Sequence, residues 1–129
     1  MEKGTKAAKG IIPMEHIENR IYTIRGKRVM LDADLADLYG VTTKRLNEQV
    51  RRNPDRFPED FVFQLEKQEA ANLMSQNATS SQATRSHGGR RKIPLVFTEH
   101  GAIMAASVLN SPRAVEVSVF IVRAFVKLR

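Results

Sequence analysis

The chain of 129 residues contains no cysteine and no tryptophan. The absence of cysteine excludes disulfide bonds, thiolate zinc sites and cysteine nucleophiles, and it fits a reducing compartment. No apolar run approaches the roughly 20 residues that a membrane-spanning helix needs. The N-terminus also lacks the apolar stretch of a secretory signal peptide. We therefore expect a cytoplasmic chain with no membrane partner.

Patterns that support catalysis or cofactor binding are also missing. The three histidines are scattered along the chain, and no ligand spacing connects them to a metal or a nucleophile. Three aspartates between Asp32 and Asp37 lack the glycine and the terminal glutamate of a calcium loop, and the positive end of a helix explains them more simply. No phosphate-binding loop or dinucleotide fingerprint occurs. We expect a protein that is not an enzyme, with no metal and no cofactor.

Positive charge is what the chain has in excess. Its net charge is +7 and its pI is near 10.1, which favours a polyanionic partner such as nucleic acid. The length and the hydrophobic content of 42% are typical of one domain with a single modest core. Residues 1–16 begin with a polar, lysine-containing stretch, so we assign them to a flexible N-terminal segment and residues 17–129 to the domain.

Residues 32–53 form the central pattern of the chain, two short helices with a sharp corner between them. Asp32 is a favourable N-cap for the first helix, and Gly40 stands where a helix needs a left-handed residue to end. Thr42 or Thr43 then caps a second helix. Two helices joined by a short glycine-containing turn, with a basic second helix, are typical of a helix-turn-helix, although any helical hairpin shares part of this pattern.

The second helix of this unit supplies the main candidate site. Leu46 and Val50 define its inward face at 100° per residue. One strip of the helix is expected to face base edges, where arginine reads guanine, asparagine reads adenine and glutamate accepts from cytosine. Its members are Lys44, Asn47, Glu48 and Arg51. The other flank and the helix start are expected to hold the DNA backbone through Thr43, Arg45 and Arg52. The alternative is a basic face that only contacts solvent.

A second candidate site lies in the polar segment 75–92. Its composition predicts a long loop, and its end combines paired glycines with three adjacent cations, Arg90, Arg91 and Lys92. Paired glycines allow close approach to a phosphate, and the cations neutralise it. We expect phosphate contacts here, and the alternative is a solvated basic loop.

Short strands and further helices are expected around this unit. The runs 21–24 and 27–30 predict a hairpin with a turn at Arg25-Gly26, whose cations either contact phosphates or form a solvated edge. Alternation over 61–65 predicts a half-buried strand with Phe61, Phe63 and Leu65 inward and Val62 outward. The runs 66–74 and 98–109 predict helices, the first with Ala70, Leu73 and Met74 on its apolar side, and 95–97 predicts a strand.

The C-terminal run after Ser111-Pro112 suits either a strand or a helix. We predict a helix from its Ser-Pro start and from its length, because strands rarely exceed about ten residues. Such a helix is apolar nearly all round, which favours a homodimer through it. Val119, Ile121 and Phe125 are the candidates for self-association, and the alternative is that each belongs to the core.

The ordered segments from about Ile17 to Arg129 resemble the ORF6N domain. The segments are IYTIRGKRVMLDADLADLYGV, RLNEQVRRNPDRFPEDFVFQL, GGRRK and FTEHGAIMAASVLNSPRAVEVSVFIVRAFVKLR, and they include specific clusters such as Arg56-Phe57-Pro58. The resemblance implies a small α+β domain with a helix-turn-helix, related to the KilA-N and Bro-N domains of phages and large DNA viruses. It also implies DNA binding, and a place in phage antirepressor-like proteins ahead of a separate C-terminal domain that is absent from this chain. It does not supply a set of DNA-contacting residues.

Two functions therefore fit the sequence. The favoured one is sequence-recognising binding to double-stranded DNA as a module of a phage-type or prophage-type transcription regulator. The other is a protein-interaction module that sequesters a repressor or another partner through its basic surface. Their salt dependence separates them, because binding to DNA phosphates weakens steeply as salt rises.

Overall fold

A β-hairpin begins the sheet at the predicted place. Strands β1 (Ile21–Ile24) and β2 (Lys27–Leu31) pair antiparallel around Arg25 and Gly26, which both have positive φ, 55° and 76°. Two consecutive left-handed residues are the requirement of the type I′ turn, whose twist matches that of the flanking strands. The hairpin prediction is confirmed.

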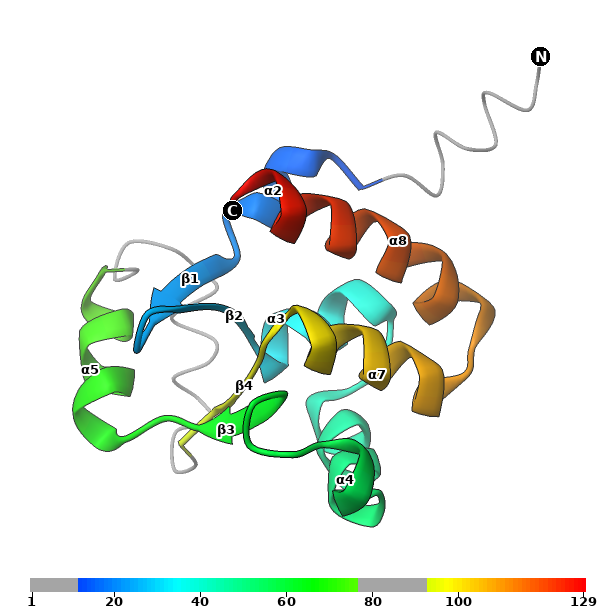
Figure 1. Cartoon of the computed structure of the whole chain (residues 1–129), viewed down its shortest axis with the longest axis horizontal. Helices are drawn as coiled ribbons and strands as arrows, with labels where there is room; N and C mark the ends of the chain where they lie inside the picture. Colours follow the sequence, from blue (N-terminus) through cyan, green and yellow to red (C-terminus); the bar gives the residue numbers. More distant parts are fainter. Residues whose placement is uncertain (1–11, 77–92) are drawn as a thin grey trace.

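The computed structural model describes residues 12–76 and 93–129, and there it has an α+β fold (Figure 1). Strands β3 (Val62–Gln64) and β4 (Leu95–Phe97) complete a four-stranded antiparallel sheet in the order β1-β2-β4-β3. The described part holds six α-helices, listed here in chain order: α2 (Met14–Glu18), α3 (Asp32–Tyr39), α4 (Thr43–Arg52), α5 (Lys67–Gln76), α7 (Glu99–Leu109) and α8 (Pro112–Lys127). A single 3-10 turn, η1 (Pro54–Arg56), follows α4.

The strand register places one buried residue of each strand in a row across the sheet. Ile21 pairs with Met30, Met30 with Phe97, and Phe97 with Val62. Because directly opposed residues point to the same face of a sheet, this row forms the floor on which the helices pack. All four side chains belong to the larger core cluster, together with residues of α2, α3, α4, α7 and α8.

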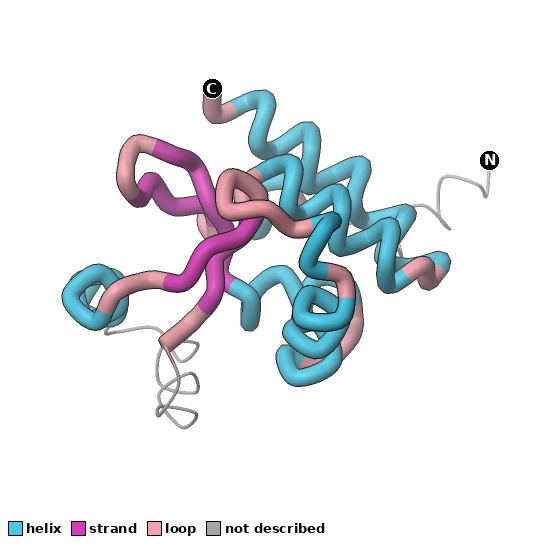
Figure 2. Tube along the Cα trace, turned by 60° about the horizontal axis from the view of Figure 1, so that its bottom comes forward, coloured by secondary structure: helices cyan, strands magenta, loops and turns pink. Residues whose placement is uncertain are grey.

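The opposite face of the sheet carries a smaller second core. Val29 and Val96 are fully buried there, under Leu73 of α5. Figure 2 shows α5 and the larger group of helices on different sides of the strands. Both faces are thus covered, and this corrects one part of the predicted strand at 61–65. Phe63 and Leu65 pack inward as predicted, on the α5 side, but Val62 is not outward, since it is buried against the helices on the other face.

The C-terminal run forms a helix, as predicted from its Ser-Pro start. The Ser111 hydroxyl accepts a hydrogen bond from the Ala114 amide at 3.1 Å, and Pro112 occupies the first turn. Ile121 and Phe125 are buried in the core, so they are not available for self-association. Val119, the third candidate, is 47% exposed.

Smaller differences from the predictions have local causes. Met74 of α5 is exposed, because α5 covers a narrow strip of the sheet and Leu73 fills it. The first described helix begins at Met14, inside the segment 1–16, and packs on α8 through the buried Ile17. In the described residues, no helix is both long enough and apolar enough to cross a membrane.

Candidate nucleic-acid interface

The turn between α3 and α4 is a closed, hydrogen-bonded corner. Gly40 has φ of 74°, and its amide donates to the Asp37 carbonyl at 3.1 Å while the Val41 amide donates to the Ala36 carbonyl at 3.0 Å. This pair of bonds is the Schellman ending, which satisfies the last carbonyls of a helix. The predicted role of Gly40 is confirmed. The unit α3–α4 is therefore held at a defined angle by its own backbone.

A cation from the far end of the chain secures the same corner. Arg113 of α8 donates from Nε to the Leu38 carbonyl at 3.0 Å, and its side chain lies against Gly40. A positive group favours the negative end of the α3 dipole. No local sequence pattern points to this contact, because the two residues are 75 positions apart.

Helix α4 begins at a well-formed cap. The Thr42 hydroxyl accepts from the Arg45 amide at 3.0 Å, which selects Thr42 from the two predicted threonines. Thr43 is the first helical residue and is half-buried. An open hollow of about 400 Å³ lies beside this helix start, lined by Asp37, Gly40, Val41, Thr42 and Arg45. The hollow combines the amides of a helix start and Arg45, which attract anions, with the Asp37 carboxylate, which is paired with Arg20 at 3.0 Å.

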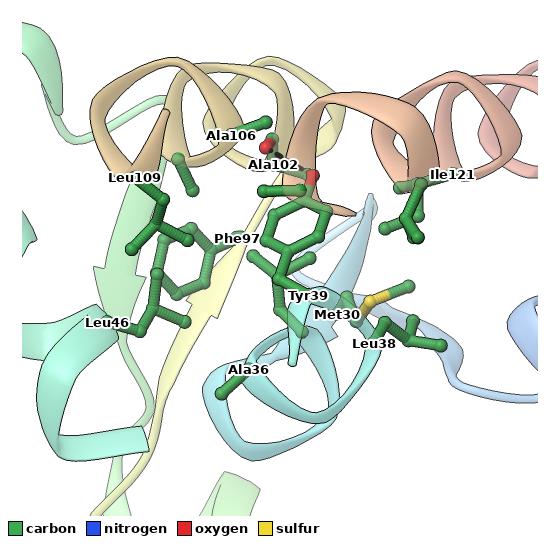
Figure 3. Close-up of a cluster of buried hydrophobic side chains, with 14 of the residues drawn as sticks. Met30, Ala36, Leu38, Tyr39, Leu46, Phe97, Ala102, Ala106, Leu109 and Ile121 are labelled. Carbon is green, nitrogen blue, oxygen red and sulfur yellow. Dashed lines mark hydrogen bonds between the residues drawn. The ribbon is translucent and has the colours of Figure 1, made fainter. Parts of the chain in front are cut away.

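The inward face of α4 fixes it to the core. Leu46 is fully buried and points toward Phe97 and Leu109 (Figure 3). Its partner helix α3 is fixed in turn by Tyr39, whose buried hydroxyl donates to the Ala102 carbonyl of α7 at 2.7 Å. The predicted inward position of Leu46 is confirmed. Burial raises the pKa of Tyr39, because the ionised form would lack solvation.

A buried carboxylate joins α3, α4 and the sheet. Asp32 is 6% exposed, and its Oδ2 accepts from Asn47 Nδ2 at 3.0 Å and from the Leu95 amide at 3.3 Å. Its predicted position as the N-cap is wrong, since Leu31 occupies that position; Asp32 is the first helical residue, and its Oδ1 accepts from the Ala33 amide at 2.7 Å. Asn47 lies at the edge of the outward face of α4, and its Oδ1 has no access to solvent. Its amide is thus directed toward Asp32.

The outward strip of α4 consists of four exposed cations and one half-buried acid. Its members are Lys44, Arg45, Glu48, Arg51 and Arg52. At 100° per residue they cover a continuous arc of about 120°, so the two predicted flanks form one surface. Figure 1 shows α4 at the end of the molecule farthest from α8. Arg56 in η1 is also exposed and adds a cation past the end of the helix, next to the exposed Asp55; the sequence did not predict it as a site residue.

The cations of the β1–β2 hairpin differ from those of α4, because one of them is paired with an acid. Arg25 forms a two-point contact with Glu69 of α5, with both N···O distances 2.8 Å, and its guanidinium lies 4.6 Å from the centre of the Phe63 ring. The hydrogen bond to Glu69 raises the pKa of Arg25, and the same bond lowers the pKa of Glu69. Lys27 and Arg28 remain exposed. A second hollow of about 290 Å³ lies beside Arg25, away from α4.

The other predicted site, Arg90 to Lys92, lies outside the described residues. The structure therefore brings together the cations of α4, adds Arg56, and ties Asn47 to a neighbouring helix. A surface of this kind, on a helix that follows a glycine corner, is shared by many nucleic-acid-binding domains.

Comparison with known families agrees with the pattern of the fold. The family model of the ORF6N domain matches residues 19–108, from the end of α2 almost to the end of α7. The chain belongs to the ORF6N family. No curated protein and no solved structure matches the chain.

Proposed function

We propose that this domain binds double-stranded DNA in a sequence-dependent way, as the recognition module of a phage-type or prophage-type regulator. The observation that carries the proposal is the outward strip of α4. It presents four exposed cations on a helix whose opposite face is fixed by a fully buried leucine. A rigid, convex and cationic helix fits the major groove, which is wide enough to admit an α-helix.

In this proposal, different parts of the interface have different tasks. Lys44 and Arg51 lie together at one side of the strip and Glu48 at its centre, and in this proposal these three face the bases, with Glu48 as an acceptor for cytosine. Arg45 and Arg52 lie together at the other side and hold the sugar-phosphate backbone. Thr43 sits at the helix start, where free amides receive a phosphate.

Asn47 takes a supporting task in this proposal. Its amide donates to the buried Asp32 carboxylate, so it sets the spacing of α3 and α4 instead of reading adenine. The Schellman corner and Arg113 fix the same spacing from the other end of α3. The expected consequence is an interface that needs little rearrangement on binding.

A mobility-shift titration over a salt series tests the proposal. The logarithm of the association constant should fall linearly with the logarithm of salt concentration, with a slope of about −0.9 for each phosphate contact. The double variant Arg45→Ala/Arg52→Ala should flatten this slope by about two contacts. Lys67→Ala, which removes an exposed cation from α5 on another side of the molecule, serves as the matched control.

Two outcomes would contradict the proposal. One is the absence of any shift with duplex DNA at low salt. The other is an equal change of the salt slope, per charge removed, in Arg45→Ala/Arg52→Ala and in Lys67→Ala. Such a result would mean that positive charge anywhere on the surface is sufficient for binding. Binding to a protein partner with little salt dependence would instead support the alternative of a repressor-sequestering module.

A further inference from the structure

Helix α8 carries a narrow apolar stripe on its solvent side. Val115, Val119 and Val126 are 51%, 47% and 46% exposed, and Val122 between them is half-buried. Their spacing of four, three and four residues places them within an arc of about 60° on a helix with 100° per residue. The same 4-3-4 spacing of β-branched residues is typical of the contact seam between two packed helices.

This stripe is distinct from the face that α8 buries in its own domain. The buried face is formed by Ala114, Val117, Ile121, Ala124 and Phe125, which pack on α2, α3 and α7. The centres of the two faces are about 140° apart around the helix. The valine stripe therefore adds nothing to the core, and its exposure favours a contact outside the domain.

We propose that the valine stripe binds a second copy of this chain, with the two α8 helices antiparallel and related by a two-fold axis. In this arrangement Val119 faces Val122 of the second copy, and Val115 faces Val126 of the second copy. The axis passes between the levels of Phe120 and Ile121. A two-fold contact of this kind is self-complementary, since the same stripe supplies both sides.

Two charged residues beside the stripe select both the partner and the direction. Glu116 and Arg123 are exposed, and both lie on the same flank of the stripe, about 20° apart around the helix. An antiparallel two-fold pair brings equal flanks together and places Glu116 within about two residues of the level of Arg123 of the second copy. The contact forms twice, once at each end.

A parallel pair gives no such match. It would set the charged flank of one copy against the opposite flank of the other, where the nearest α8 residue is Ser118. Charge complementarity along an apolar seam is a common determinant of helix orientation. The stripe also lies far from α4 in the fold (Figure 1), so the proposed dimer does not depend on DNA binding and leaves both α4 surfaces open.

Cysteine crosslinking tests the direction directly, because the natural chain has no cysteine. In the antiparallel pair, two copies of residue 115 are about 16 Å apart along the helix axis, beyond the roughly 4.4–6.8 Å between Cα atoms that a disulfide allows. Val115→Cys alone should therefore stay uncrosslinked under mild oxidation. An equimolar mixture of Val115→Cys and Val126→Cys should give a covalent dimer. Crosslinking of Val115→Cys with itself would overturn the antiparallel arrangement.

Sedimentation equilibrium tests the contact itself. The seam is small, so we expect a dimer with a dissociation constant on the order of 10 µM or weaker. Val119→Glu should weaken dimerisation by at least about tenfold, whereas Met74→Glu, an exposed apolar position on α5, should leave it unchanged. Circular dichroism checks that both variants are folded.

Charge reversal provides a second test that does not touch the valines. Glu116→Arg and Arg123→Glu should each weaken the dimer, and the double variant should restore it, because the pairs then form with opposite polarity. A chain that stays monomeric up to several hundred micromolar would overturn the proposal and assign the stripe to a different partner. The same conclusion would follow if Val119→Glu dimerised as well as the natural chain.

Discussion

Asn47 Nδ2 lies 3.0 Å from Asp32 Oδ2, and this contact joins the second helix of the α3–α4 unit to the start of the first. Asp32 is buried and also accepts from the Leu95 amide of β4. A buried carboxylate is stable only when donors compensate for its lost hydration. The pair therefore fixes how α4 is set against α3 and the sheet.

We predict that Asn47→Ala lowers the free energy of unfolding by about 1–3 kcal/mol, because it removes a donor from a buried charged group. The measurement is urea denaturation of single and double variants with Asp32→Asn, since a double-mutant cycle isolates the coupling between the two side chains. Unchanged stability together with a lost preference at one base position would show instead that Asn47 reads DNA.

Gly40 allows a second prediction that separates backbone strain from contact. Gly40 and Gly26 have nearly equal φ values, 74° and 76°, but a Cβ at Gly40 would lie 2.8 Å from Arg113 Cδ, whereas nothing lies within 4 Å at Gly26. Each substitution by alanine should cost about 1–2 kcal/mol for the left-handed conformation. Gly40→Ala should cost more, since it also displaces Arg113 from the Leu38 carbonyl.

The control for Gly40 is the double variant Gly40→Ala/Arg113→Ala. Removing the arginine side chain frees the space beside Gly40. Relative to Arg113→Ala alone, the double variant should therefore lose about as much stability as Gly26→Ala loses relative to the natural chain. Thermal unfolding gives the comparison. Equal losses for Gly40→Ala and Gly26→Ala in the presence of Arg113 would show that the corner does not depend on this side chain.

Tyr39 gives a prediction in pH. Burial raises its pKa above the ordinary tyrosine value of 10.0, so at alkaline pH the unfolded chain loses the proton first. The contribution of Tyr39 to stability is therefore complete below about pH 10 and decreases as the pH rises further. Tyr39→Phe should cost about 0.5–1.5 kcal/mol at pH 7 through the lost bond to Ala102, and the deficit should shrink above pH 10.

The comparison between Tyr39→Phe and the natural chain is made by urea denaturation at several pH values between 7 and 11. Other groups also ionise in this range, but their effects are common to both proteins and cancel in the difference. If the difference in free energy of unfolding between the natural chain and Tyr39→Phe stays constant or grows above pH 10, the buried position of the hydroxyl is contradicted.

Local signals in the sequence were sufficient for most elements of the fold. Gly40 predicted the corner because few residues adopt a positive φ, and Ser111-Pro112 predicted the start of α8 because both favour a first helical turn. The Arg25-Gly26 turn followed from the same kind of rule. These elements depend on the backbone preferences of a few adjacent residues.

Features that depend on distant contacts were not predictable in the same way. Val62 was assigned to the solvent side of its strand, because alternation does not reveal that both faces of the sheet are covered. The contacts of Asp32 with Leu95 and of Arg113 with Leu38 join residues 63 and 75 positions apart. For the candidate site, helical periodicity located the outward cations of α4 but could not show that Asn47 turns toward a buried carboxylate.

In the proposed function, the outward strip of α4 reads base sequence. Arg51→Ala should leave stability nearly unchanged, because Arg51 is exposed, yet should lose about 1–3 kcal/mol of discrimination at one base pair. Lys67→Ala on α5 is the control and should alter neither quantity.

The most direct measurement is selection of duplex sites from a random pool by the natural chain, followed by titration of every single-base variant of the selected site with Arg51→Ala. We expect the base preference to relax at one position and to persist at the others. A uniform loss of affinity across all positions, or an unchanged preference at every position, would contradict it.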